Sequence, residues 1–178
     1  MIVGHFGLVG LVRSRLRLAS LVWLIPAAVA PDLLDLMYSL TGICSPYGLY
    51  SHTLPAVVLL AAAIGGAALL AEGRATALGC ALVALLHPAL DFFTGNKLFW
   101  PGGEMHGLRL YDRPLSDFAL ESIILVAGWS LARRAGDRPM WTRSIAGLAA
   151  LLAIQATANV LHRSIKPSTC AMVPAARL

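Results

Sequence analysis

The stretch LPAVVLLAAAIGGAALLA, residues 54–71, decides the fold class of this chain. Its 18 residues carry no formal charge, and an apolar run of that length is typical of a helix that crosses a lipid bilayer. A second run of 18 residues, Ser144 to Leu161, is equally free of charge. Both runs predict transmembrane helices, so the chain is expected to be an integral membrane protein.

The composition of the whole chain supports this expectation. Of its 178 residues, 58% are hydrophobic and 13% are charged, whereas soluble domains average about 45–50% apolar and about 25% charged residues. A soluble enzyme, a coiled coil and a disordered chain are therefore excluded. The net charge is +5, but the basic residues are scattered between apolar runs, so no nucleic-acid partner is expected. Residues 1–166 are predicted to form one membrane-embedded domain, followed by a flexible tail over 167–178.

Two further apolar runs complete a set of four predicted spans. They are Ala75–Phe93, which contains His87 and Asp91, and Asp117–Ala132, which contains Glu121. Ionisable residues inside a span are costly, at roughly 2.5–3.5 kcal/mol each on insertion scales, and normally face the interior of a helix bundle with a partner. These residues therefore indicate a buried polar site.

The N-terminal part has a different pattern. Met1–Val12 and Leu18–Ala30 are apolar runs of 12 and 13 residues, separated by the basic segment Arg13–Arg17, and each is too short to span a bilayer alone. We expect a hairpin of two short, partly inserted helices. The predicted fold is thus an all-α integral membrane protein with a short N-terminal helical hairpin and four transmembrane helices, connected on one side by long loops at Tyr38–Ser51 and Thr94–Arg113.

Consecutive spans alternate between the two sides of the membrane, so the side on which each polar residue lies can be counted along the chain. The count places eight ionisable residues at one side: His5, Asp32, Asp35, His52, His87, Asp91, Asp117 and Glu121. His87 and Asp91 are four residues apart and Asp32 and Asp35 are three apart, so each pair can project from one helical face.

A bound cation is the simplest common partner for such a set. Imidazole and carboxylate ligands suit zinc or another first-row divalent ion. Cys44, Cys80 and Cys170 show no CxxC spacing, so a thiolate zinc site is not expected. The predicted cofactor is a divalent metal ion, with zinc as the first candidate.

Simpler roles stay open for individual residues. His5 can be an interfacial histidine near the N-terminus, and Asp32 or Asp35 can end or cap a helix. Glu121 can pair with Arg113 rather than take part in chemistry. The separation of two titratable groups by one turn inside an apolar helix, as at residues 87 and 91, is harder to explain without charge compensation.

Five motifs along the chain resemble one known family. They are Gly4-His5-Phe6-Gly7, Pro31-Asp32-Leu-Leu-Asp35, Tyr50-Ser51-His52-Thr53, His87-Pro-Ala-Leu-Asp91 and Leu98-Phe-Trp-Pro101-Gly-Gly103. Their order is similar to that in the YdjM-type membrane-bound, predicted metal-dependent hydrolases, over residues 4–130. The resemblance implies that the metal and catalytic residues are His5, Asp32, Asp35, His52, His87 and Asp91. The chain departs from the family pattern in lacking a histidine after Asp35 and in having Pro46-Tyr47-Gly48 where His-Arg-Gly is common.

The expected function is a metal-dependent hydrolase that acts on an ester or phosphoester of a lipid or lipid-linked substrate at the membrane interface. The metal ligands are expected among His5, Asp35, His52, His87 and Asp91. Asp32 and Glu121 are the candidates for the general base or for a group that orients a ligand histidine.

Three basic residues in the second long loop, Lys97, Arg109 and Arg113, are candidates for holding an anionic headgroup, although ordinary juxtamembrane charge is an equally good explanation. The rival function is a transporter or membrane partner protein that uses the same polar cluster for ions or protons. The protein is expected in a bacterial inner (plasma) membrane, and a slight bias of basic residues predicts that the site is on the external face.

Overall fold

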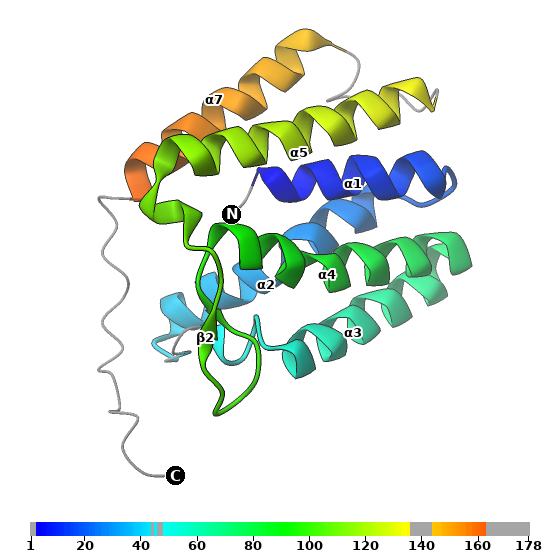
Figure 1. Cartoon of the computed structure of the whole chain (residues 1–178). Helices are drawn as coiled ribbons and strands as arrows, with labels where there is room; N and C mark the ends of the chain where they lie inside the picture. Colours follow the sequence, from blue (N-terminus) through cyan, green and yellow to red (C-terminus); the bar gives the residue numbers. More distant parts are fainter. Residues whose placement is uncertain (1–2, 44, 46–47, 136–143, 163–178) are drawn as a thin grey trace.

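The computed structural model describes residues 3–43, 45, 48–135 and 144–162, which form six α-helices and a two-stranded hairpin (Figure 1). In chain order the helices are α1 (Gly4–Arg15), α2 (Leu21–Thr41), α3 (Leu54–Glu72), α4 (Arg74–Thr94), α5 (Pro114–Arg134) and α7 (Ile145–His162). The segment between α4 and α5 contains β1 (Lys97–Leu98), β2 (Met105–His106) and the 3-10 helix η2 (Leu110–Asp112). The predicted tail at 167–178 lies outside the described residues.

The predicted fold class, an all-α membrane protein, is confirmed. Four helices among the described residues are long and apolar enough to cross a membrane, namely α2, α3, α4 and α5. The predicted span at 144–161 corresponds to α7, of which the described apolar part, Ile145–Thr157, is shorter than a span. At 1.5 Å per residue, the 19 residues of α3 extend about 28 Å, close to the thickness of a bilayer core of about 30 Å.

The prediction that the second arm of the N-terminal hairpin is a short helix ending near Ala30 is wrong. Helix α2 continues to Thr41 with Pro26 and Pro31 inside it, and ends at Gly42, whose φ of 75° is the left-handed conformation that terminates helices. Prolines are tolerated in membrane helices because neighbouring groups satisfy the freed backbone carbonyls. Asp32 and Asp35 therefore lie inside a helix and not at its end.

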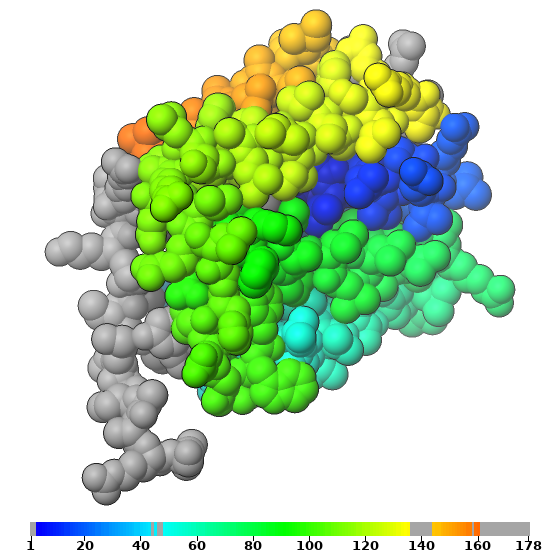
Figure 2. All heavy atoms as spheres, in the orientation of Figure 1, coloured from blue at the N-terminus to red at the C-terminus, as the bar shows by residue number. Residues whose placement is uncertain are grey.

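Helix α1 is a buried central helix. It packs between α5 on one side and α4 and α2 on the other, and in Figure 2 it is visible only as a band between α5 and α4. Its 12 residues extend about 18 Å, too short to cross a bilayer, so its N-terminus, with the buried His5, lies inside the bundle.

Glycines permit the close contact between α1 and α5. A Cβ atom on Gly7 would lie 2.4 Å from the carbonyl oxygen of Ile124, and one on Gly10 would lie 2.4 Å from that of Gly128. Gly7 meets Ile124 and, one turn further along α1, Gly10 meets Gly128, one turn further along α5. Helices α1 and α5 therefore run in the same direction. Small residues at such crossings let helix backbones approach closely inside membranes.

We expect Gly128→Ala to lower the melting temperature of the detergent-solubilised protein strongly, because the new Cβ would meet the carbonyl oxygen of Gly7 at 2.1 Å and overpacking of this kind costs about 1–3 kcal/mol or more. The matched control is Gly66→Ala in α3, where nothing lies within 4 Å of the new Cβ. That variant should unfold at or above the wild-type temperature. Equal melting temperatures for the two variants would contradict the described packing of α1 on α5.

The loop between α4 and α5 is tied to the end of the bundle at which the polar residues gather. Strands β1 and β2 pair antiparallel, with Lys97 opposite His106. The backbone N–H of Leu54 donates to the carbonyl of Phe99 at 2.8 Å, and the N–H of Leu108 donates to that of Phe92 at 2.8 Å. These bonds hold the hairpin against the start of α3 and the end of α4.

Candidate metal centre

Histidine and aspartate side chains from four segments converge near the N-terminus of α1. His5 comes from α1, Asp32 from α2, His52 from the turn before α3, and His87 and Asp91 from α4. The three histidines and Asp91 are at most 1% exposed, and Asp32 is partly buried. The structure therefore brings together five of the residues that the sequence placed at one side of the membrane.

A hydrogen bond made by Nδ1 of His87 determines which of the two ring nitrogens carries the proton. Nδ1 lies 2.9 Å from the carbonyl oxygen of Ala28, and because a carbonyl only accepts, Nδ1 must carry the proton. Ala28 lies inside α2, three residues before Pro31. In the neutral imidazole, Nε2 of His87 therefore carries no proton and presents a lone pair.

That lone pair faces two carboxylates. Nε2 of His87 lies 3.3 Å from Oδ2 of Asp91 and 3.9 Å from Oδ1 of Asp32. Neither Nε2 of His87 nor Oδ2 of Asp91 makes a hydrogen bond of good geometry within the described part of the chain. Acceptor atoms that face one another in a buried site need a proton or a cation between them.

His52 lies across the same space. Its Nε2 is 3.3 Å from Oδ1 of Asp32 and 3.2 Å from Oδ2 of Asp91. On the opposite side of the ring, Nδ1 is 3.2 Å from Oδ2 of Asp35 and 2.7 Å from Oγ of Ser51. Ser51 also donates a short hydrogen bond to Asp35. Asp35 thus contacts the nitrogen of His52 that points away from the shared space.

The turn before α3 is shaped for His52. The backbone N–H of His52 donates to the carbonyl of Gly48 at 2.7 Å. Gly48 has a φ of 75°, and a Cβ at this position would lie 2.8 Å from Nδ1 of His52. Only glycine combines this backbone conformation with the close approach of the imidazole ring.

His52 lies outside the candidate spans, and its environment favours the protonated ring in the absence of another cation. Burial lowers the pKa of His52, but its hydrogen bonds with Asp32 and Asp35 outweigh burial and raise the pKa above its ordinary value. The surrounding carboxylates therefore create a strong demand for positive charge at this point.

His5 packs directly against His87. The two rings are stacked, with centroids 3.8 Å apart and an angle of 18° between their planes. His5, His87 and Asp91 form one group whose ligand atoms lie within 4.8 Å of one another, and Asp32, His52 and His87 form a second. Both groups share His87, which has only Nε2 to offer, so the geometry favours a single ion.

Glu121 is buried in α5, one turn after the equally buried Asp117. Its carboxylate faces the backbone N–H of Gly4, at the start of α1, and lies within electrostatic range of Asp91. Arg113 is exposed, and no ion pair joins it to Glu121 within the described residues. The geometry thus places Glu121 beside the His5 end of the cluster.

The three predicted basic residues lie in different environments. Lys97 is partly buried, and its charge acts on Asp35, His52 and Asp91. Arg109 is exposed and forms an ion pair with Asp112 at 3.1 Å. Lys97 therefore lies close enough to the cluster for its charge to act on these three residues.

Tyr111 was not predicted to be near the site. Its ring approaches the Cα of Gly95, where an added Cβ would lie 3.5 Å from Cε2 of Tyr111, and Gly95 follows Asp91 by one turn, with its N–H bonded to the Asp91 carbonyl at 2.8 Å. Burial raises the pKa of Tyr111 well above its ordinary value, and the charges of Asp91 and Glu121 add to this effect. Nothing in the sequence distinguishes this tyrosine, because its position depends on the path of the segment between α4 and α5.

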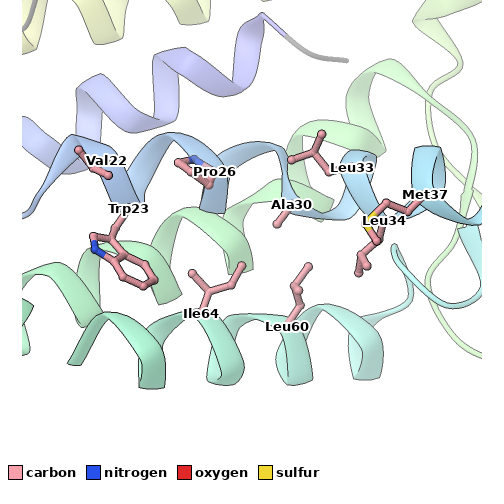
Figure 3. A pocket seen from close by; sticks show the side chains of 9 residues that line it. All are labelled: Val22, Trp23, Pro26, Ala30, Leu33, Leu34, Met37, Leu60 and Ile64. Carbon is pink, nitrogen blue, oxygen red and sulfur yellow. The ribbon is translucent and has the colours of Figure 1, made fainter. Parts of the chain in front are cut away.

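Two apolar cavities lie apart from the cluster. One, of about 410 Å³, lies between α2 and α3 and is lined by Trp23, Met37, Leu60 and Ile64 among others (Figure 3). The other, of about 540 Å³, lies between α5 and α7. No histidine, aspartate or glutamate lines either cavity.

The fold and the cluster together define an all-α membrane protein with buried histidine and aspartate groups that could hold a metal ion. Comparisons with protein-family models, with curated proteins and with solved structures find no match to this chain.

Proposed function

We propose that this protein is a membrane-bound, metal-dependent hydrolase that acts on an ester or phosphoester of a lipid or lipid-linked substrate. The observation that carries the proposal is the fixed tautomer of His87, whose bare Nε2 faces the carboxylates of Asp91 and Asp32. An imidazole with one nitrogen bonded to a backbone carbonyl and the other free is the usual arrangement of a metal-ligating histidine. The resemblance of the sequence motifs to the YdjM-type hydrolases supports the same proposal.

In this proposal the ion is held by Nε2 of His52, Nε2 of His87 and a carboxylate oxygen each of Asp32 and Asp91, with His5 beside them. In the proposed site Asp32 binds the metal and Asp35 orients His52, whereas the expectation from the sequence had Asp35 among the ligands and Asp32 as the base or orienting group. Zinc suits this nitrogen and oxygen ligand set. The donor atoms are still more than 3 Å apart, as expected for ligands around a central cation.

The depth of the cluster supports a lipid substrate. His5 lies ten residues from Arg15 at the end of α1, and His87 lies 13 residues from Arg74 at the start of α4. At 1.5 Å per residue, His5 and His87 are about 15–20 Å from that end of the bundle, within a bilayer core of about 30 Å, whereas His52 precedes α3 and lies outside the candidate spans. A substrate that reaches this depth is expected to be a lipid or to carry a lipid chain.

When bound, a divalent ion would supply Lewis-acid activation of a water molecule and of the scissile group. The residues of the chain supply the proton acceptor, a hydrogen-bond donor and a positive charge for the substrate. Glu121 accepts a proton as general base from its buried position beside Gly4, Tyr111 stays protonated as a hydrogen-bond donor, and Lys97 attracts an anionic headgroup. Asp35 and Ser51 hold the ring of His52 in one orientation.

We expect Asp35→Asn to weaken zinc binding about 10–100-fold, the usual cost of losing a group that orients a ligand histidine. The amide keeps the shape of the side chain but not its charge beside Nδ1 of His52. The loss should be smaller than that caused by Asp91→Asn, and Asp112→Asn in the exposed Arg109–Asp112 pair is the matched control. Competition with a zinc-chelating dye measures all three. A loss for Asp35→Asn as large as that for Asp91→Asn would instead make Asp35 a ligand.

The proposed reaction is tested by incubating the detergent-solubilised protein with chromogenic esters and phosphoesters that carry an acyl chain. Turnover should need zinc or another divalent ion, stop with a chelator, and be lost in His52→Ala. Metal-dependent uptake of ions into vesicles, without turnover of any ester, would favour the transporter function. Turnover that persists in His52→Ala would contradict the proposed site.

A further inference from the structure

The end of the bundle opposite the metal cluster carries a concentration of arginines. We propose that this end binds the phosphodiester headgroups of anionic phospholipids. The arginine end, as we name it, consists of Arg13, Arg15, Arg17, Arg74, Arg133 and Arg134. Five of the six are exposed, and Arg13 is partly buried.

Packing contacts bring these arginines together from three parts of the chain. Helices α1 and α5 run in parallel, with Gly10 against Gly128, so their C-terminal turns lie at the same end of the bundle. The N–H of Ser20, in the turn after α1, donates to Oγ1 of Thr76 at 3.1 Å, which places the start of α4 beside that turn. Figure 1 shows the ends of α1 and α5 and the α3–α4 turn at one end of the bundle.

Compensation of helix dipoles does not account for the whole set. Arg13, Arg15, Arg133 and Arg134 lie in last turns, where a cation is favourable. Arg74, however, is the first residue of α4, where the dipole disfavours a cation, and Arg17 lies in the turn outside α1. No ion pair joins Arg74 to the nearby Glu72 in the described part of the chain. Arg17 and Arg74 are therefore placed where an external anion can pair with them.

Two exposed apolar side chains beside the arginines favour a lipid as the source of the anion. Leu18 follows Arg17 directly and is 86% exposed, and Val22, at the start of α2, is 77% exposed. A surface that alternates basic and apolar side chains at the end of membrane-spanning helices fits the boundary between headgroups and acyl chains. Trp129, whose ring lies 5.0 Å from the guanidinium carbon of Arg133, is also typical of this boundary.

Lipid binding at the arginine end also predicts the orientation of the protein in the membrane, independently of the proposed hydrolase reaction. Clusters of arginines adjoining membrane helices favour the cytoplasmic side, where anionic lipids produce a negative surface potential. The metal cluster, at the other end of the bundle, then lies on the side of the opposite leaflet.

The test compares two matched double variants in mixed micelles that contain either phosphatidylglycerol or phosphatidylcholine. Arg15→Gln with Arg17→Gln removes two exposed charges from the arginine end, and Arg109→Gln with Arg113→Gln removes two exposed charges from the opposite end. We expect the wild type and the second variant to bind phosphatidylglycerol at least about tenfold more tightly than phosphatidylcholine, and the first variant to lose most of that preference.

The wild type provides a second measurement that does not depend on the folding of a variant. Its preference for phosphatidylglycerol should disappear near 1 M salt, where the Debye length is about 3 Å. Arg15→Lys with Arg17→Lys should keep the preference, because the charges are kept. Equal binding of the two lipids by the wild type, a preference that persists in high salt, or equal losses in the two glutamine variants would overturn the proposal.

Discussion

Replacing His87 with alanine is expected to lower the affinity of the protein for zinc more than about 100-fold, because loss of a group that merely orients a ligand already costs about 10–100-fold. His87 belongs to both groups of candidate ligands, so each of these two arrangements loses a ligand in the variant. Zinc titration against a competing chelator, on protein purified in detergent, measures the change.

Two further variants make this result interpretable. Asp91→Asn keeps the shape of the side chain and should cause a comparable loss of zinc, which guards against a misfolded His87→Ala protein. His106→Ala removes an exposed histidine of β2 that lies outside both groups of candidate ligands and should bind zinc as the wild type does. Wild-type affinity in both His87→Ala and Asp91→Asn would contradict a metal site at this cluster.

Glu121→Gln is expected to reduce turnover about 10²–10⁴-fold, the usual contribution of a general base, while zinc affinity changes little. The amide preserves the size of a side chain that is 1% exposed and can still contact Gly4, but it cannot accept the proton. Turnover and zinc affinity measured on the same preparation separate the two effects. Arg113→Gln is the control and should keep full turnover, since Arg113 is exposed and no ion pair joins it to Glu121 within the described residues.

A different outcome would assign another role to Glu121. Full turnover in Glu121→Gln would exclude it as the base. A large fall in melting temperature together with loss of zinc would show that its contact with the start of α1 holds His5 and the cluster in place.

The sequence was sufficient for the fold class because uncharged runs such as 54–71 leave little alternative to membrane helices. It was also sufficient to group His5, His52, His87 and Asp91 at one side of the membrane, because successive spans alternate direction. Both inferences depend on run length and chain order, which are properties of the sequence alone.

The sequence was insufficient where the outcome depends on packing. Helix α2 continues through Pro26 and Pro31, although proline usually ends a helix, because membrane neighbours compensate the lost backbone bonds. The Ala28 carbonyl that fixes the tautomer of His87 comes from this same region, and no sequence pattern marks it. The separation of roles between Asp32 and Asp35 likewise follows from which nitrogen of His52 each one contacts.

The central claim is that a single divalent ion lies between Nε2 of His52, Nε2 of His87 and the carboxylates of Asp32 and Asp91. Anomalous diffraction at the zinc absorption edge, from crystals of the zinc-loaded protein, tests it most directly. The account predicts one strong peak per chain, about 2.0–2.1 Å from each of the two histidine nitrogens. The absence of a peak at this cluster, or a peak only at exposed groups such as Asp112, would contradict it.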